Sequence, residues 1–126
     1  MTGFTYDAGA LIAAEAGDPH MWRRHRDALE QGLLPTVPAA VLAQVWRGGP
    51  QALLSRFLTG CEIETLDDVR ARAAGELCAL SRTADTTDAA VVVGAVARRD
   101  VVVTSDRRDI RRLAAALGAK VETIAV

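Results

Sequence analysis

Short runs of β-forming residues alternate with helical stretches along the whole chain, and no hairpin turn joins any two of these runs. The clearest run is DVVVTS at 100–105, which is β-branched and is entered from a charged residue. Strands that alternate with helices are joined by crossovers, so the sheet is parallel and helices cover both of its faces. The sequence therefore predicts an α/β class, a three-layer fold with a central parallel sheet of about five strands flanked by helices.

Proline and glycine mark the boundaries of the expected helices, with proline at several starts and glycine at several ends. The expected strands are 3–7, 33–37, 62–66, 100–105 and 120–126. The expected helices are 8–17, 20–32, 38–49, 50–60, 68–80, 88–99 and 106–119.

The composition predicts a globular protein, and we expect no membrane-spanning segment in it. The chain has 126 residues, half of them hydrophobic and a quarter charged, which predicts one domain over 1–126 with its own core. No apolar run approaches the length of a membrane span, and the first residues lack the basic start of a signal peptide. Cys61 and Cys78 have no metal-site spacing, so we expect free thiols in a cytoplasmic protein.

The formal net charge of −1 gives no global sign of a nucleic-acid partner. The cations are nevertheless unusual, because arginine supplies 14 of the 15, and six arginines fall between Arg98 and Arg112. The planar guanidinium group donates two parallel hydrogen bonds and suits phosphate. A GC-rich source genome would produce the same excess of arginine, and both explanations stay open.

Three aspartates fall where strands end or where the neighbouring helix begins. Asp7 closes the first expected strand, Asp106 follows the VVVT strand, and Asp88 opens the apolar helix before that strand. Function in open parallel sheets collects at the carboxyl ends of the strands. Carboxylates 4 Å apart near a protein surface repel by about 4 kcal/mol per pair, so a cation is expected among them. Oxygen ligands favour Mg²⁺ or Mn²⁺.

Each of these acids also fits a purely structural role. Aspartate is among the best helix N-caps, and Asp7 stands directly before a helix. Asp85 and Asp88 are three residues apart, as are Asp106 and Asp109, which is the spacing of a capping pair. Capping explains each acid singly, and the coincidence of three at one edge favours a metal site.

The segments YDAGALIA, VPAAVLAQVWRGG, TTDAAVVVGAVARR and VVVTSDRRDIRRLAAALG occur in this order over nearly the whole chain. In this arrangement the chain resembles the PIN-domain ribonucleases, in particular the VapC-type toxins of bacterial toxin–antitoxin pairs. The resemblance implies a PIN-like α/β domain that cleaves RNA with Mg²⁺ or Mn²⁺ held by acids. Carried over by position, Asp7, Asp88 and Asp106 are the catalytic, metal-binding residues. Asp109 lies one helical turn after Asp106 and is expected to support it or share its role.

The sequence departs from the family pattern in two places. The family has a glutamate on the helix after the second strand, where this chain has Gln44. Glutamine keeps an acceptor oxygen but carries no charge, which leaves open whether Asp85 or Glu15 compensates. The second departure is Ala8-Gly9 after Asp7, where the family often has a hydroxyl residue.

The resemblance also implies a cognate antitoxin protein as partner, RNA as substrate and a homodimer. Two other readings stay open: a PIN-fold module weakened by Gln44 that only binds RNA or protein, and a different Mg²⁺-dependent phosphotransfer enzyme. Among the remaining residues, we expect His20 and His25 on the surface of a polar helix and Trp46 in the core.

Overall fold

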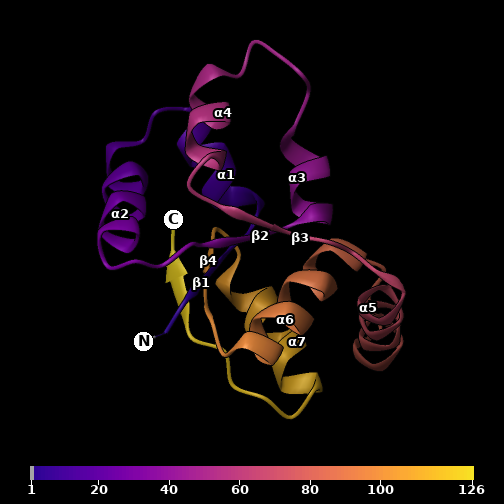
Figure 1. The fold of residues 1–126 in the computed structure, drawn as a ribbon. Coiled ribbons are helices and arrows are strands. Elements are labelled where there is room, and N and C mark those ends of the chain that lie inside the picture. Colours follow the sequence, from indigo (N-terminus) through magenta and orange to yellow (C-terminus); the bar gives the residue numbers. More distant parts are fainter. Residues whose placement is uncertain (1) are drawn as a thin grey trace.

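The computed structural model describes residues 2–126, and its centre is a five-stranded sheet in which every neighbouring pair of strands is parallel. The order across the sheet is β3-β2-β1-β4-β5 (Figure 1). The strands are β1 Phe4–Tyr6, β2 Thr36–Pro38, β3 Glu62–Glu64, β4 Val101–Thr104 and β5 Thr123–Ala125. The α/β class with a parallel sheet of five strands, expected from the alternating pattern, is confirmed.

Helices cover both faces of this sheet. Within residues 2–126 they are α1 Ala8–Glu15, α2 Pro19–Glu30, α3 Ala39–Val45, α4 Ala52–Leu58, α5 Asp68–Ser81, α6 Thr86–Arg98 and α7 Arg107–Ala116. On one face α6 packs against β1, β2 and β4, while α7 packs against β5 and α5 packs against α6 and α7. On the other face α1 lies against β1 and β4 and contacts α2, α3 and α4 (Figure 1). None of these helices is both long and apolar enough to cross a bilayer.

The elements match the sequence expectation in kind, and the differences lie at their ends. The strand expected at 33–37 begins only at Thr36, and the one expected at 120–126 covers only Thr123–Ala125. The central strand β1 is three residues long, so the ladders that pair it with β2 and β4 are equally short. Helix α6 begins at Thr86 rather than at residue 88, because the Asp85 side chain caps it.

A cluster of aromatic rings lies in the core between β1, α2 and α4. Tyr6 and Phe57 are fully buried, and the ring of Phe57 stacks on His25 with centroids 3.9 Å apart. The Tyr6 hydroxyl and His25 Nδ1 are hydrogen-bonded at 2.9 Å. The expectation that His25 lies on the surface is therefore wrong: it is 3% exposed, and burial lowers its pKa. Its place on the buried face of α2, beside Met21 and Ala28, explains this.

Trp46 also differs from expectation, because it is 41% exposed. Helix α3 buries Val41 and Val45, one turn apart, and Trp46 follows the last helical residue with an extended backbone. Its side chain is therefore outside the face that α3 turns toward the core. Both cysteines are free, as expected, and burial raises the pKa of the Cys61 thiol to about 12.

Arg98, at the end of α6, forms ion pairs with two acids. It pairs with Glu64 of β3 and with Asp100, whose Oδ2 lies 2.9 Å from Arg98 Nε. It also donates to the Thr5 hydroxyl at 2.9 Å. Gly94 leaves room for this network, since a Cβ there would lie 2.6 Å from Glu64 Oε1. These contacts join the C-terminal end of α6 to both β1 and β3.

The two outermost strands of the sheet, β3 and β5, differ in charge. Edge strand β3 begins and ends with a glutamate, whereas edge strand β5 reads Thr-Ile-Ala. On the inner side of β5, the Glu122 carbonyl and the Val126 N–H pair with β4. In a parallel ladder alternate residues face opposite neighbours, so the peptide groups of Thr123 and Ala125 point away from the sheet.

Candidate metal centre

Strands β1 and β4 are neighbours, and their carboxyl ends bring Asp7 and Asp106 to one edge of the sheet. The register pairs Tyr6 with Val103, and the Asp7 N–H continues the ladder to the Val103 carbonyl at 3.0 Å. Helix α6 packs against both strands and starts at the same edge, which brings Asp88 of its first turn to the same place.

Asp7 is 5% exposed, and both of its carboxylate oxygens accept hydrogen bonds. Oδ1 accepts from the Ala8 N–H at 2.8 Å, so Asp7 caps α1. Oδ2 accepts from the Thr104 hydroxyl at 2.7 Å. The same Thr104 oxygen accepts from the Asp106 N–H at 2.9 Å. A single buried hydroxyl therefore links the acids that end β1 and β4.

Gly9, one of the departures from the family pattern, lies directly against the end of β4. A Cβ at position 9 would lie 2.5 Å from the Ser105 hydroxyl oxygen. A serine or threonine at position 9 would not fit without displacing Ser105, which itself places a hydroxyl group beside the start of α1.

Among residues 2–126, Asp88, Asp106 and Asp109 form a group in which one oxygen of each lies within 4.8 Å of the other two. Asp88 is half-buried, and Asp106 and Asp109 are exposed. Asp7 lies outside this group of three, but its charge raises the pKa of both Asp88 and Asp106. From the sequence we expect Asp109 to support Asp106 or share its role. In the fold Asp109 lies beside both Asp88 and Asp106.

The electrostatics of this edge are those of uncompensated negative charge. Burial, followed by the charges of Asp7 and Asp85, a hydrogen bond with Asp85 and the charge of Asp106, raises the pKa of Asp88 to about 7. Partial desolvation and the adjacent Asp109 raise the pKa of Asp106. Carboxylate oxygens in one group, at high negative potential, are the donor set that Mg²⁺ and Mn²⁺ prefer. The residues therefore fit a hard divalent cation.

The other candidate residues have different surroundings. Asp85 is exposed and caps α6, its Oδ1 accepting from the Asp88 N–H at 3.0 Å. Gln44 is exposed on α3, and within residues 2–126 no hydrogen bond joins it to the carboxylates. Glu15 accepts from the Gln51 amide at 3.2 Å. The charge of Asp85 raises the pKa of Asp88, whereas Glu15 is hydrogen-bonded to Gln51.

Sequence reasoning missed Thr104, which is fully buried and hydrogen-bonded to the acids on both sides. The signal available was its place at the end of the strand, two residues before Asp106. A threonine at the end of a β-branched strand is common for packing alone, so the pattern gave no reason to single it out.

No protein-family model matches this sequence, and no curated protein is significantly similar to it. Solved structures do match over almost the whole chain. One is a chain of VapBC2 from Rickettsia felis bound to a DNA fragment from their promoter, with a TM-score of 0.72, 15% identity and 98% of both chains covered. Another is a chain of DNA-bound VapBC from Salmonella typhimurium, with a TM-score of 0.71, 20% identity, and 99% of this chain and 98% of that chain covered.

The chain shares the fold of these VapBC structures. The resemblance inferred from the sequence segments is thereby confirmed for the fold. At identities of 15% and 20%, the structures share a fold while most side chains differ. The chemistry of this chain is therefore argued from its own carboxylates.

Proposed function

We propose that this chain is a metal-dependent ribonuclease of the VapC type, the toxin of a toxin–antitoxin pair. The observation that carries the proposal is the convergence of acids from β1, β4, α6 and α7 at one edge of the sheet, where burial and the charges of the neighbouring acids raise the pKa of Asp88 to about 7. Repulsion of this kind is relieved by a divalent cation, and the shared fold of the VapBC structures supports the same conclusion.

Asp88, Asp106 and Asp109 would hold Mg²⁺ or Mn²⁺, with Asp7 behind them adding negative charge. A divalent ion bound there supplies a Lewis acid that polarises a phosphodiester and activates water for hydrolysis. Thr104 keeps the Asp7 carboxylate and the Asp106 backbone in fixed positions through its two hydrogen bonds. Asp88 must release its carboxyl proton before it binds a cation, so cation binding strengthens as the pH rises through 7.

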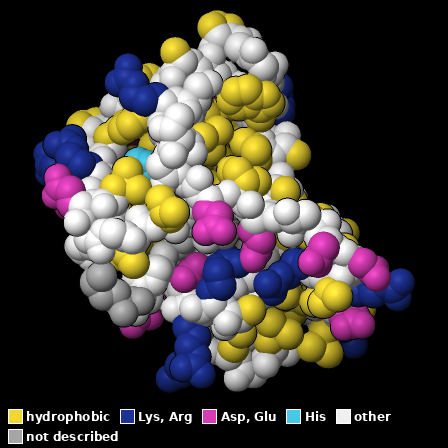
Figure 2. Space-filling model, viewed as in Figure 1, with side chains coloured by type: hydrophobic (Ala, Val, Ile, Leu, Met, Phe, Trp, Pro, Cys, Tyr) yellow, Lys and Arg dark blue, Asp and Glu magenta, His cyan; other side chains and the backbone are white. Residues whose placement is uncertain are grey.

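An exposed apolar surface supports the proposed antitoxin partner. Ile12 is 57% exposed, Trp46 41% and Leu53 37%. They belong to α1, the end of α3 and α4, which pack together. Figure 2 shows hydrophobic side chains gathered over these helices, above a band of acidic and basic side chains. A segment of antitoxin laid over this surface would cover it, and the expected homodimer is part of the same proposal.

The test compares purified wild type with Asp88→Asn, and with Asp67→Asn as the matched control. Asp67 is exposed and caps α5, and asparagine caps about as well as aspartate. We expect wild type and the control to cut RNA with Mn²⁺ and to lose the activity in EDTA, and Asp88→Asn to be inactive. Expression of the wild type alone should arrest bacterial growth.

Two results would replace this proposal. RNA binding of equal strength in EDTA and Mn²⁺, without any cutting, would make the chain a binding module. Hydrolysis of a small phosphoester but not of RNA would make it a different phosphotransfer enzyme on the same sheet.

A further inference from the structure

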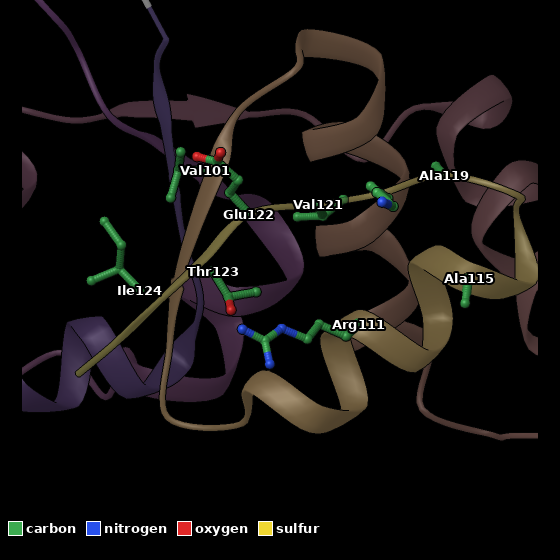
Figure 3. Close-up of a pocket in the computed structure, with 9 residues that line it drawn as sticks. Val101, Arg111, Ala115, Ala119, Val121, Glu122, Thr123 and Ile124 are labelled. Carbon is green, nitrogen blue, oxygen red and sulfur yellow. The ribbon is translucent and has the colours of Figure 1, made fainter.

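A groove of about 770 Å³ runs along the outer side of β5, beside α7. Small apolar residues form much of its wall, and its cationic and hydroxyl groups come from Arg111, Lys120 and Thr123. Figure 3 shows the Arg111 side chain extending from α7 toward Thr123. Glu122 is the acid in this lining, and it projects from the opposite side of the strand to Thr123 (Figure 3).

A second arginine contacts the groove wall without being one of its lining residues. Arg107 Nε donates to the Thr123 hydroxyl at 3.1 Å, which leaves the two terminal amino groups of its guanidinium group for another partner. Arg107 and Arg111 are four residues apart on α7, so their Cβ atoms lie on one flank of the helix about 6 Å apart. Arg107 therefore lies one helical turn nearer the start of α7 than Arg111, which lines the groove.

These cations are not neutralised by the protein. The ion pairs found among residues 2–126 occupy Arg70, Arg72 and Arg98, and none involves Arg107, Arg111 or Lys120. All three side chains are exposed. Like most arginines of the described residues they have no acid partner, so they are available to an external anion, and Arg111 and Lys120 are set apart by lining the groove.

The groove connects to the candidate metal centre through Arg107, which is hydrogen-bonded to the lining residue Thr123, while none of the carboxylates lines the groove itself. Arg107 follows Asp106 directly and is the first residue of α7, and Lys120 lies beyond the other end of that helix. An anionic chain bound at the carboxylates through a cation would continue past Arg107 and Arg111. The groove has no aromatic lining residue on which a base would stack. Contacts in it would therefore be made to phosphates, independently of base sequence.

We propose that the groove between α7 and β5 binds the backbone phosphates of single-stranded RNA beside the bond to be cut, through Arg107 and Arg111, with Lys120 at its far end. This inference rests on the proposed ribonuclease function and assigns a substrate-binding surface to it. The hydrogen bond to Thr123 holds Arg107 in an orientation that faces the groove.

The experiment measures binding without cutting. Fluorescence anisotropy follows a labelled oligouridylate of about ten nucleotides on the full chain in EDTA, over a series of salt concentrations. The variants are Arg107→Gln and Arg111→Gln. The matched control is Arg112→Gln, an exposed arginine of the same helix that neither lines the groove, as Arg111 does, nor is hydrogen-bonded to a lining residue, as Arg107 is. Thermal melts check that all variants are folded.

We expect each groove variant to bind about tenfold more weakly than wild type, as the loss of one charge-assisted hydrogen bond predicts. The slope of log K against log salt should fall by about 0.7 for each phosphate contact removed. Arg112→Gln should keep the affinity and slope of the wild type.

Equal losses in the control and the groove variants would overturn the proposal, because the attraction would then be diffuse. Unchanged binding in both groove variants would overturn it as well. Tighter binding of poly-glutamate than of RNA, with the same dependence on Arg111, would assign the groove to an acidic protein segment instead. Since the assay needs no cleavage, it distinguishes the two proposals. RNA binding at the groove by a chain that cuts no RNA would refute the ribonuclease function and still support the binding groove.

Discussion

Replacing Asp88 by asparagine should make the metal-free protein more stable while it abolishes metal binding. The carboxyl group has an ordinary pKa of 3.8 and a pKa of about 7 in the fold. Between these values the folded chain binds more protons than the unfolded chain, so stability falls as the pH rises from about 4 to 7. Above pH 7 the full cost of the ionised carboxylate is present, and the uncharged amide removes it.

The size of the effect follows from the same difference. At 1.36 kcal/mol per pH unit, the change from 3.8 to about 7 corresponds to about 4 kcal/mol. Asp88 is only half-buried, and water screens its repulsion from the other acids, which reduces the expected gain to about 1–2 kcal/mol. In a chain of this length that gain raises the melting temperature by about 3–8 °C.

Thermal melts followed by circular dichroism in EDTA at pH 8 measure this gain, with Asp67→Asn as the control that should melt like wild type. Addition of Mn²⁺ should then raise the melting temperature of wild type and of the control but leave Asp88→Asn unchanged. If Asp88→Asn melts below wild type at pH 8 in EDTA, the carboxylates do not repel one another. The argument for a cation at this edge would then fail.

Three further outcomes follow from the packing and the hydrogen bonds. Thr104→Val should cost about 1–2 kcal/mol in urea unfolding and weaken Mn²⁺ binding in calorimetry, because the Asp7 carboxylate loses a buried donor, while Thr104→Ser should restore both. Phe57→Ala should cost about 3–5 kcal/mol in the same unfolding assay, since the ring is fully buried against other aromatic rings. The lowered pKa of His25 means that the unfolded chain binds more protons near pH 6, so stability should fall as the pH drops below about 6.5. The Asp88→Asn background shows this most clearly, because it removes the opposing titration; a flat stability between pH 5 and pH 8 there would contradict the buried neutral imidazole.

The arrangement of the strands was predictable because it depends on local patterns that repeat along the chain. The β-branched run before Asp106 and the short run before Asp7 each identify a strand, and parallel strands meet at their carboxyl ends. Asp88 was predictable for a different reason, since the spacing of Asp85 and Asp88 is that of a capping pair at a helix start, although α6 begins at Thr86, two residues earlier than expected. These rules together place the acids at one edge without any knowledge of side-chain contacts.

The rest of the candidate site depends on contacts that no local pattern encodes. Thr104 becomes important only because its hydroxyl lies between two acids almost a hundred residues apart in the sequence. The nearness of Asp109 to Asp88 depends on how α7 leaves the strand before it. His25 was misjudged because α2 is polar on most of its surface, and its buried face is defined by Tyr6 and Phe57, which belong to other elements.

The uncharged edge of the sheet has a consequence for solubility. Peptide groups that point outward from an edge strand are sites where copies of a protein pair edge to edge, and natural sheets discourage this with charged residues. The glutamates of β3 protect one edge, whereas β5 has no charged residue of its own and the cations beside it come from α7 and from Lys120. Concentrated samples of this chain would self-associate through β5 first. Ala125→Lys is the substitution that would keep it in solution, at an exposed position of β5 that pairs with Thr104 of β4.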